Sequence, residues 1–267
     1  MGSALDTISG FVTAPGSTFT AWTPGLGDSM QIRNSNPAKR TLLLEAWAYN
    51  QSAGTLRIRS PKLHDNVQGI RFAVPANSVD FNIPYEISQV AYPQDILIAE
   101  QTGSATAGQI ESGSILIYYE DLPGVAGRFI DGPGLQKRGV NVVNVEIALT
   151  PTATGGYSGQ LALNSQFDLL QANTDYAVLG YLCNARAASV TIRGPDTGNL
   201  RCSGPAEPTK RDQTVQWFTR LSERTGIPLC PIINSANKSG TFIDVVQNQA
   251  AGAVTVNWVM LQLAPGT

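Results

Sequence analysis

One seven-residue pattern occurs twice in this chain of 267 residues, as TLRIRSP at residues 55–61 and as SVTIRGP at residues 189–195. In both, two apolar residues alternate with polar ones and a proline follows. Alternation with a period of two indicates a half-buried strand, and proline ends a strand because it has no N–H to donate. The pattern therefore indicates that one strand is present in two copies.

Neighbouring stretches recur in the same order, which supports a duplication of the whole fold. Pro24 pairs with Pro151 at an offset of 127, Trp47 with Tyr181 at 134, and Tyr119 with Trp258 at 139. A slowly drifting offset is what loops of changing length between fixed strands would give. The glycine-rich stretch DLPGVAGRFIDGPGLQKRG joins the halves. We predict a first copy at 1–124, a linker at 125–139 and a second copy at 140–267.

Short apolar runs bounded by turn residues predict the strands of each copy. The run at 41–50 is apolar on both faces, as a central strand is. Further expected strands lie at 17–23, 29–33, 69–74, 95–100 and 114–120, and at 141–149, 159–163, 200–203, 214–219, 241–247 and 253–263. The stretch 214–226 also reads as a helix ending at Gly226. Six to eight strands per copy predict an all-β chain of two tandem jelly-roll (β-sandwich) copies that arose by internal duplication.

The charge of the chain limits its partners. The net charge is −2 and no basic cluster is present, so we expect no direct contact with nucleic acid. No Lys or Arg precedes an apolar run in the first thirty residues, and no apolar run approaches a bilayer span, so we expect neither a secretion signal nor membrane insertion.

The three cysteines do not form a recognisable ligand or disulfide pattern. Cys183, Cys202 and Cys230 are odd in number and widely spaced, and His64 is the single histidine. We expect buried, unpaired thiols, no metal and no cofactor. The glycosylation patterns at Asn50 and Asn237 are interpreted as chance matches.

No motif predicts catalysis. His64 lies in an expected surface loop, Ser158 lacks the spacing of a nucleophile elbow, and Lys137 lies in a stretch whose glycines and lysine are in the wrong order for a phosphate loop. Arg57, Arg59 and Arg193 are interpreted as solvated strand faces or interface contacts. Acidic residues of the first copy are scattered without calcium-binding spacing, at Asp65, Asp80, Asp95, Glu100, Glu111, Glu120 and Asp121.

Two acids distant in sequence can still meet as a glycosidase pair, and a two-domain enzyme of sandwich type stays an alternative. Nothing in the sequence favours either, so we predict a protein that is not an enzyme, with no catalytic, cofactor-binding or metal-binding residues.

The arrangement of two β-rich copies, inferred from the paired stretches quoted above, resembles that of the double jelly-roll major capsid proteins. These proteins belong to tailless, often membrane-containing, double-stranded DNA viruses. The resemblance covers the whole chain and rests on architecture. It implies a homotrimer whose six jelly rolls form a pseudo-hexagonal tile of an icosahedral virion, assembled in the host cytoplasm. It also implies lattice contacts with neighbouring trimers, and minor capsid or penton proteins and an internal membrane as further partners. The N-terminus, often a membrane-facing helix in the family, is here short and contains glycines.

A tandem β-sandwich that binds carbohydrate or a receptor is the alternative function. Sugar platforms use exposed aromatic residues, and the chain has Trp22, Trp47, Trp217 and Trp258. Trp47 and Trp258 lie in apolar runs, where a core position is expected.

Overall fold

The computed structural model describes residues 2–25, 28–62, 66–80, 89–166, 168–249 and 252–266. Nineteen strands are described, and those of the first half form two sheets. One sheet has the order β3-β1-β10-β4-β7, with β8 also on β4, and the other has β2-β9-β5-β6. The bounds are β1 Gly2–Thr13, β2 Thr20–Ala21, β3 Thr23–Pro24, β4 Thr41–Asn50, β5 Gly54–Arg59, β6 Ile70–Val74, β7 Ser78–Asp80, β8 Gln89–Val90, β9 Ile98–Gln101 and β10 Ile110–Leu122.

The second half repeats this strand order. Its sheets are β11-β17-β14-β19-β12 and β13-β18-β15-β16. The bounds are β11 Phe129–Ile130, α1 Gly132–Arg138, β12 Gly139–Leu149, β13 Tyr157–Ala162, β14 Asp175–Cys183, β15 Ala187–Arg193, β16 Cys202–Ala206, α2 Arg211–Thr214, α3 Trp217–Thr225, β17 Cys230–Asn234, β18 Phe242–Val246 and β19 Val254–Leu263, with short 3-10 turns at Pro208–Lys210 and Ser235–Gly240.

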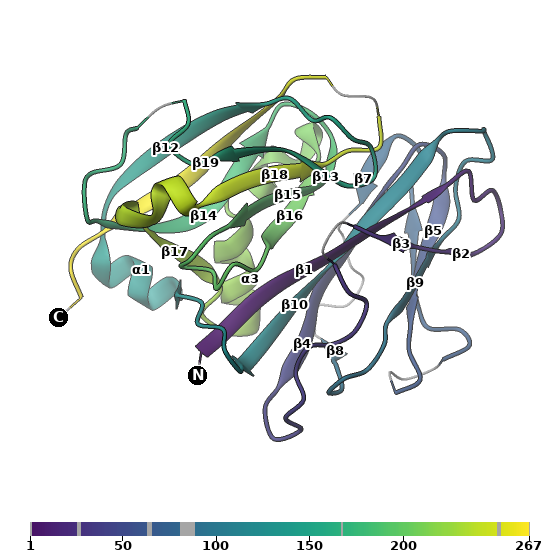
Figure 1. Cartoon of the computed structure of the whole chain (residues 1–267), viewed down its shortest axis with the longest axis horizontal. Coiled ribbons are helices and arrows are strands. Elements are labelled where there is room, and N and C mark those ends of the chain that lie inside the picture. The colour runs from purple at the N-terminus through teal and green to yellow at the C-terminus, as the bar shows by residue number, and fades with distance from the viewer. Residues whose placement is uncertain are drawn as a thin grey trace.

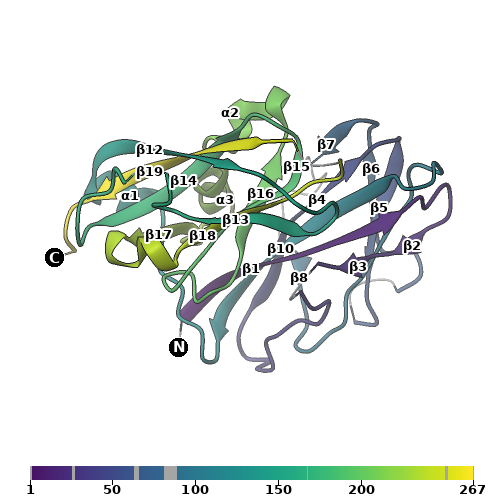
Figure 2. The same cartoon turned by 45° about the horizontal axis from the view of Figure 1, so that its top comes forward.

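Two short strands add to sheet edges, β3 beside β1 and β11 beside β17. Without them, numbering the strands of each half from one to eight gives the same two sheets twice, 1-8-3-6 and 2-7-4-5, where β7 and β8 share the sixth place. This order of two interlocked antiparallel sheets is a jelly roll. The predicted fold class is therefore confirmed: the chain is two tandem jelly rolls. Figures 1 and 2 show them packed side by side. We call the 1-8-3-6 sheets front sheets and the 2-7-4-5 sheets back sheets.

The jelly rolls meet front sheet to back sheet. The front sheet of the first, through β1, β4 and β10, lies on β15 and β16 in the back sheet of the second. Strand β4 is buried along its whole length, which confirms a central strand at 41–50. Its apolar residues pack on both sides because one face closes the first core and the other covers the second jelly roll.

The repeated heptapeptides form the same strand of each jelly roll. β5 and β15 are both fourth strands, and the apolar pairs Leu56, Ile58 and Val190, Ile192 are buried. The match of Trp47 with Tyr181 is wrong in register, because the Trp47 indole donates to Ala188 O in the other jelly roll, whereas Tyr181 points into its own core. A slip of one residue moves a side chain to the opposite face of a strand.

Several other expectations change. The strand expected at 214–219 is wrong; α2 and α3 lie there, with Phe218 and Leu221 buried and Gly226 in the left-handed conformation that ends the helix. At 29–33 the structure has an isolated bridge between Gln31 and Ile96. The N-terminal stretch forms the long strand β1, which the sequence analysis missed because its polar residues obscure the alternation. The stretch at 125–139 holds β11 and α1.

Candidate functional site

Of the residues considered for a catalytic motif, Ser158 and Lys137 lie in the described part of the chain. Ser158 donates to the carbonyl of Ala153, and Lys137 lies in the last turn of α1. His64 and Asp65 lie outside the described residues. Within the described part of the chain, no group of three or more His, Cys, Asp or Glu residues could hold a metal ion.

Two carboxylates of the first jelly roll, Glu111 and Asp95, accept hydrogen bonds that hold its loops. Glu111 accepts backbone N–H groups of Gln51, Ser52 and Ser104, although burial still raises its pKa. Asp95 accepts the hydroxyl of Ser60. These contacts fix the loops that contain the donors.

Arg59 and Arg193 are ion-paired within the chain, and their side chains stay partly exposed, at 24% and 27%, so the interpretation as solvated strand faces or interface contacts stays a prediction. Arg59 reaches Glu100 at 2.9 Å, and Arg193 reaches Asp244 at 3.5 Å. Glu100 also binds Arg57 at 2.7 Å.

The three cysteine side chains are buried and unpaired, as expected. Burial raises the pKa of Cys183 to about 11 and that of Cys230 to about 12, and it raises the pKa of Cys202 still further.

The contact between the jelly rolls is a candidate functional surface, because it shows which side chains let one sheet face pack on another. Its centre is lined by small hydroxyl side chains: Ser9 Oγ lies 2.7 Å from Ser114 Oγ and 2.7 Å from Tyr157 Oη, and Thr7 donates to Arg201 O. Trp47 adds an edge-to-face contact with Trp217 at 5.7 Å. Small side chains let two sheets approach closely, and the hydrogen bonds satisfy the polar groups buried there.

Two ion pairs cross the same contact. Arg201 binds Asp28 at 2.7 Å, and Arg224 of α3 binds Glu45 of β4 at 2.6 Å. Both carboxylates are almost wholly buried, and burial raises the pKa of each to about 7 despite its arginine. The sequence analysis missed these four residues, because nothing near them in sequence indicates a partner more than 170 positions away.

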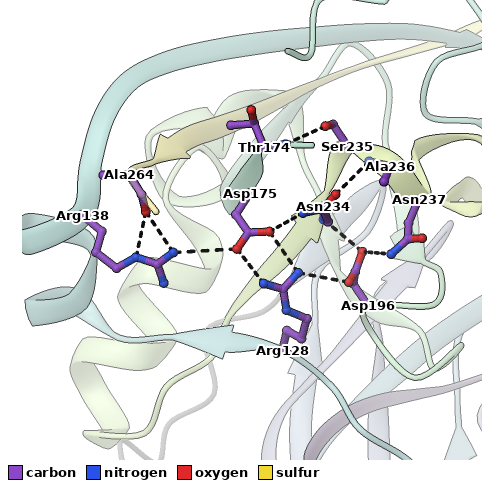
Figure 3. Close-up of polar contacts among 10 residues, drawn as sticks. All are labelled: Arg128, Arg138, Thr174, Asp175, Asp196, Asn234, Ser235, Ala236, Asn237 and Ala264. Carbon is purple, nitrogen blue, oxygen red and sulfur yellow. Dashed lines mark hydrogen bonds and ion pairs between the residues drawn. The ribbon is translucent and has the colours of Figure 1, made fainter. Parts of the chain in front are cut away.

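A second polar cluster fastens the connecting segment to the end of the second jelly roll (Figure 3). Arg128 binds Asp175 at 2.6 Å and Asp196 at 3.2 Å, and Arg138 donates to the carbonyl of Ala264. Burial opposes ionisation of Asp175, but hydrogen bonds from Arg128 and Asn234 outweigh it and lower the pKa of this carboxyl. The cluster therefore holds charged, satisfied groups, which suits an anchor better than an acid–base pair.

A pocket of about 440 Å³ adjoins this cluster. Its lining is mostly amide, hydroxyl and aliphatic side chains, from Val140, Asn173, Thr174, Asp175, Asn234, Gln262, Leu263, Ala264 and Pro265. The pocket has no aromatic residue on which a sugar ring could stack.

All four tryptophans are buried, Trp22 at 6% exposure, Trp47 at 1%, Trp217 at 5% and Trp258 at 0%. The core positions expected for Trp47 and Trp258 are confirmed. A sugar platform built on tryptophan is therefore absent from the surface of the chain.

Two sheet faces remain open, one of each kind. The outer face of β12 and β19, in the front sheet of the second jelly roll, carries the exposed side chains of Val142, Asn144, Glu146 and Ala148. The outer face of the back sheet of the first jelly roll carries Arg57, Arg59 and Arg71 with Glu100. No described helix is long and apolar enough to cross a membrane.

No family model matches the sequence, and no curated protein matches it either. Among solved structures, the STIV MCP is 10% identical, with 98% of this chain and 97% of that chain covered and a TM-score of 0.24. The PBSX exported protein XepA is 10% identical, with 96% and 86% covered and a TM-score of 0.26. The major capsid protein P2 from Bacteriophage PM2 is 7% identical, with 98% of each chain covered and a TM-score of 0.23. These TM-scores are too low to support a conclusion about function. The assignment of the fold is based on the strand order described above.

Proposed function

We propose that this chain is a structural protein, the major capsid protein of an icosahedral virion, and that three copies form a pseudo-hexagonal tile of six jelly rolls. The proposal takes residues 1–124 and 140–267 as the two building units and 125–139 as their connection. The chain acts by assembly and is not an enzyme.

One observation carries the proposal. Within the chain, the front sheet of one jelly roll covers the back sheet of the other, which leaves one back face and one front face open. A contact between unlike faces is heterologous, and repeating it generates a closed ring when the rotation closes. Three chains joined in this way would alternate front and back contacts around six jelly rolls.

The composition supports an assembly role. Only 14% of residues are charged, and large apolar side chains are exposed on strands or beside them, among them Tyr92, Ile96, Val140 and Val142. Exposed apolar side chains that lie close together mark contact surfaces, and Val140 and Val142 are two residues apart on β12. The net charge of −2 without a basic cluster suits a shell that does not bind the genome directly. The proposed partners are neighbouring trimers, and in the virion minor capsid or penton proteins and an internal membrane.

Electron microscopy of the concentrated, purified chain tests this function. We expect tiles with pseudo-sixfold outline, or sheets and shells built from them. Dispersed single chains at every concentration, together with specific binding on a glycan array, would instead support the carbohydrate-binding alternative.

A further inference from the structure

We propose that a second copy of this chain binds through Glu146, whose carboxylate on the open front face of one copy pairs with Arg71 and Arg57 on the open back face of the next. This inference rests on the proposed assembly and specifies its contact.

The described residues of the back face carry three arginines, Arg57, Arg59 and Arg71, and one carboxylate, Glu100. Arg57 and Arg71 are direct cross-strand partners on β5 and β6, and both guanidinium groups lie over the ring of Phe19, at 4.0 Å and 5.3 Å. Among the described residues, the one carboxylate on this face is Glu100, which is shared by Arg57 and Arg59. Like charges directly opposite each other on a sheet are unfavourable unless an anion compensates them.

Arg71 is the arginine of the back face that is available to a partner. Its side chain is exposed, and its hydrogen bond goes to the carbonyl of Gln68. Among the described residues no carboxylate pairs with it. The ring of Phe19 supports the guanidinium from one side, which holds it in place for a bidentate contact with an incoming carboxylate.

The front face offers the complementary charge. Glu146 is exposed on β12 opposite Asn257 of β19, and the residues beside it on that face are Asn144, Ala148 and Val259. It is the only charged residue among those that β12 and β19 direct outward, and no described cation pairs with it. The front face has one carboxylate among neutral side chains, and the back face has more arginines than carboxylates. Pairing these charges would attract the two copies and fix how one face is aligned on the other.

The contact inside the chain shows why the open back face differs from the covered one. β15 carries Thr191 where β5 carries Arg57, since Thr191 lies opposite Asp244 as Arg57 lies opposite Glu100. The covered face thus has a hydroxyl at this position, which lies 2.7 Å from the hydroxyl of Ser203 on β16. An arginine kept at the same position of the open face fits a partner that brings a carboxylate.

The test uses the full chain, with sedimentation analysis of the equilibrium between single chains and trimers. Glu146→Arg and Arg71→Glu should each raise the dissociation constant at least about tenfold, because each places like charges together. The double variant, with both charges exchanged, should return to within about threefold of the original. The controls Lys39→Glu and Glu223→Arg change exposed charges elsewhere and should leave the constant unchanged.

The outcomes separate the two proposals. If the original chain forms no trimer, the proposed function fails. If it forms a trimer that neither single reversal weakens, or that the double exchange does not restore while all variants keep the same circular dichroism, this contact is wrong and the assembly stands.

Discussion

Arg193 in the second jelly roll occupies the position that Arg59 occupies in the first. Each ends the fourth strand of its jelly roll, and each binds a carboxylate on the seventh strand two residues beyond its cross-strand partner, Arg59 with Glu100 and Arg193 with Asp244. The duplication therefore preserved an ion pair as well as a strand.

Removing the charge of Glu100 and removing that of Asp244 should change the free energy of unfolding by different amounts. Burial opposes ionisation of Glu100, but bonds from Arg59 and Arg57 lower its pKa, so Glu100→Gln should reduce the free energy of unfolding by about 1–3 kcal/mol. Burial raises the pKa of Asp244, so Asp244→Asn should cost less than about 1 kcal/mol. Urea unfolding at neutral pH measures both, and a larger loss for Asp244→Asn would contradict the assignment.

The free energy of unfolding should fall as pH rises from 5.5 to 7.5. The folded-state pKa of Asp28 and of Glu45 is about 7, well above the ordinary values of 3.8 and 4.5, so in this range the folded chain holds protons that the unfolded chain has lost. Each group contributes on the order of 1–2 kcal/mol to the decrease. Asp28→Asn and Glu45→Gln should flatten the dependence, and Glu120→Gln, on the surface, should not. A free energy that rises over the same range would refute this account.

Trp47 should couple the two jelly rolls. Its side chain is 1% exposed, donates to Ala188 O and packs on Trp217. Trp47→Ala should cost about 3–5 kcal/mol and split a single calorimetric transition into two, because the contact between the jelly rolls loses one of its two tryptophan side chains. Val67→Ala, on the surface, serves as a control. One unshifted transition in Trp47→Ala would show that the jelly rolls are coupled elsewhere.

The thiols should be unreactive until the chain unfolds. Burial raises the pKa of Cys183, Cys202 and Cys230, and the thiolate is the reactive form. An aromatic disulfide reagent at pH 8 should label none of them in the folded chain and three after unfolding. Rapid labelling of the folded chain, or fewer than three thiols after unfolding without reductant, would be inconsistent with the structure.

Local alternation predicted the strands that have one buried and one polar face, such as β5 and β15. It missed β1, whose Thr7 and Ser9 are buried against the second jelly roll. It also mismatched Trp47 with Tyr181, because composition does not show which face a fully apolar strand turns to its own core. The contact between the jelly rolls could not be predicted from the sequence for the same reason. The Asp28–Arg201 and Glu45–Arg224 pairs join residues that only the packed fold brings together.

Native mass spectrometry of the purified chain at micromolar concentration tests the central claim most directly. We expect a dominant species of three times the chain mass of 28.4 kDa. A single chain as the only species, across concentrations and at low ionic strength, would contradict the capsid assignment and favour the carbohydrate-binding one.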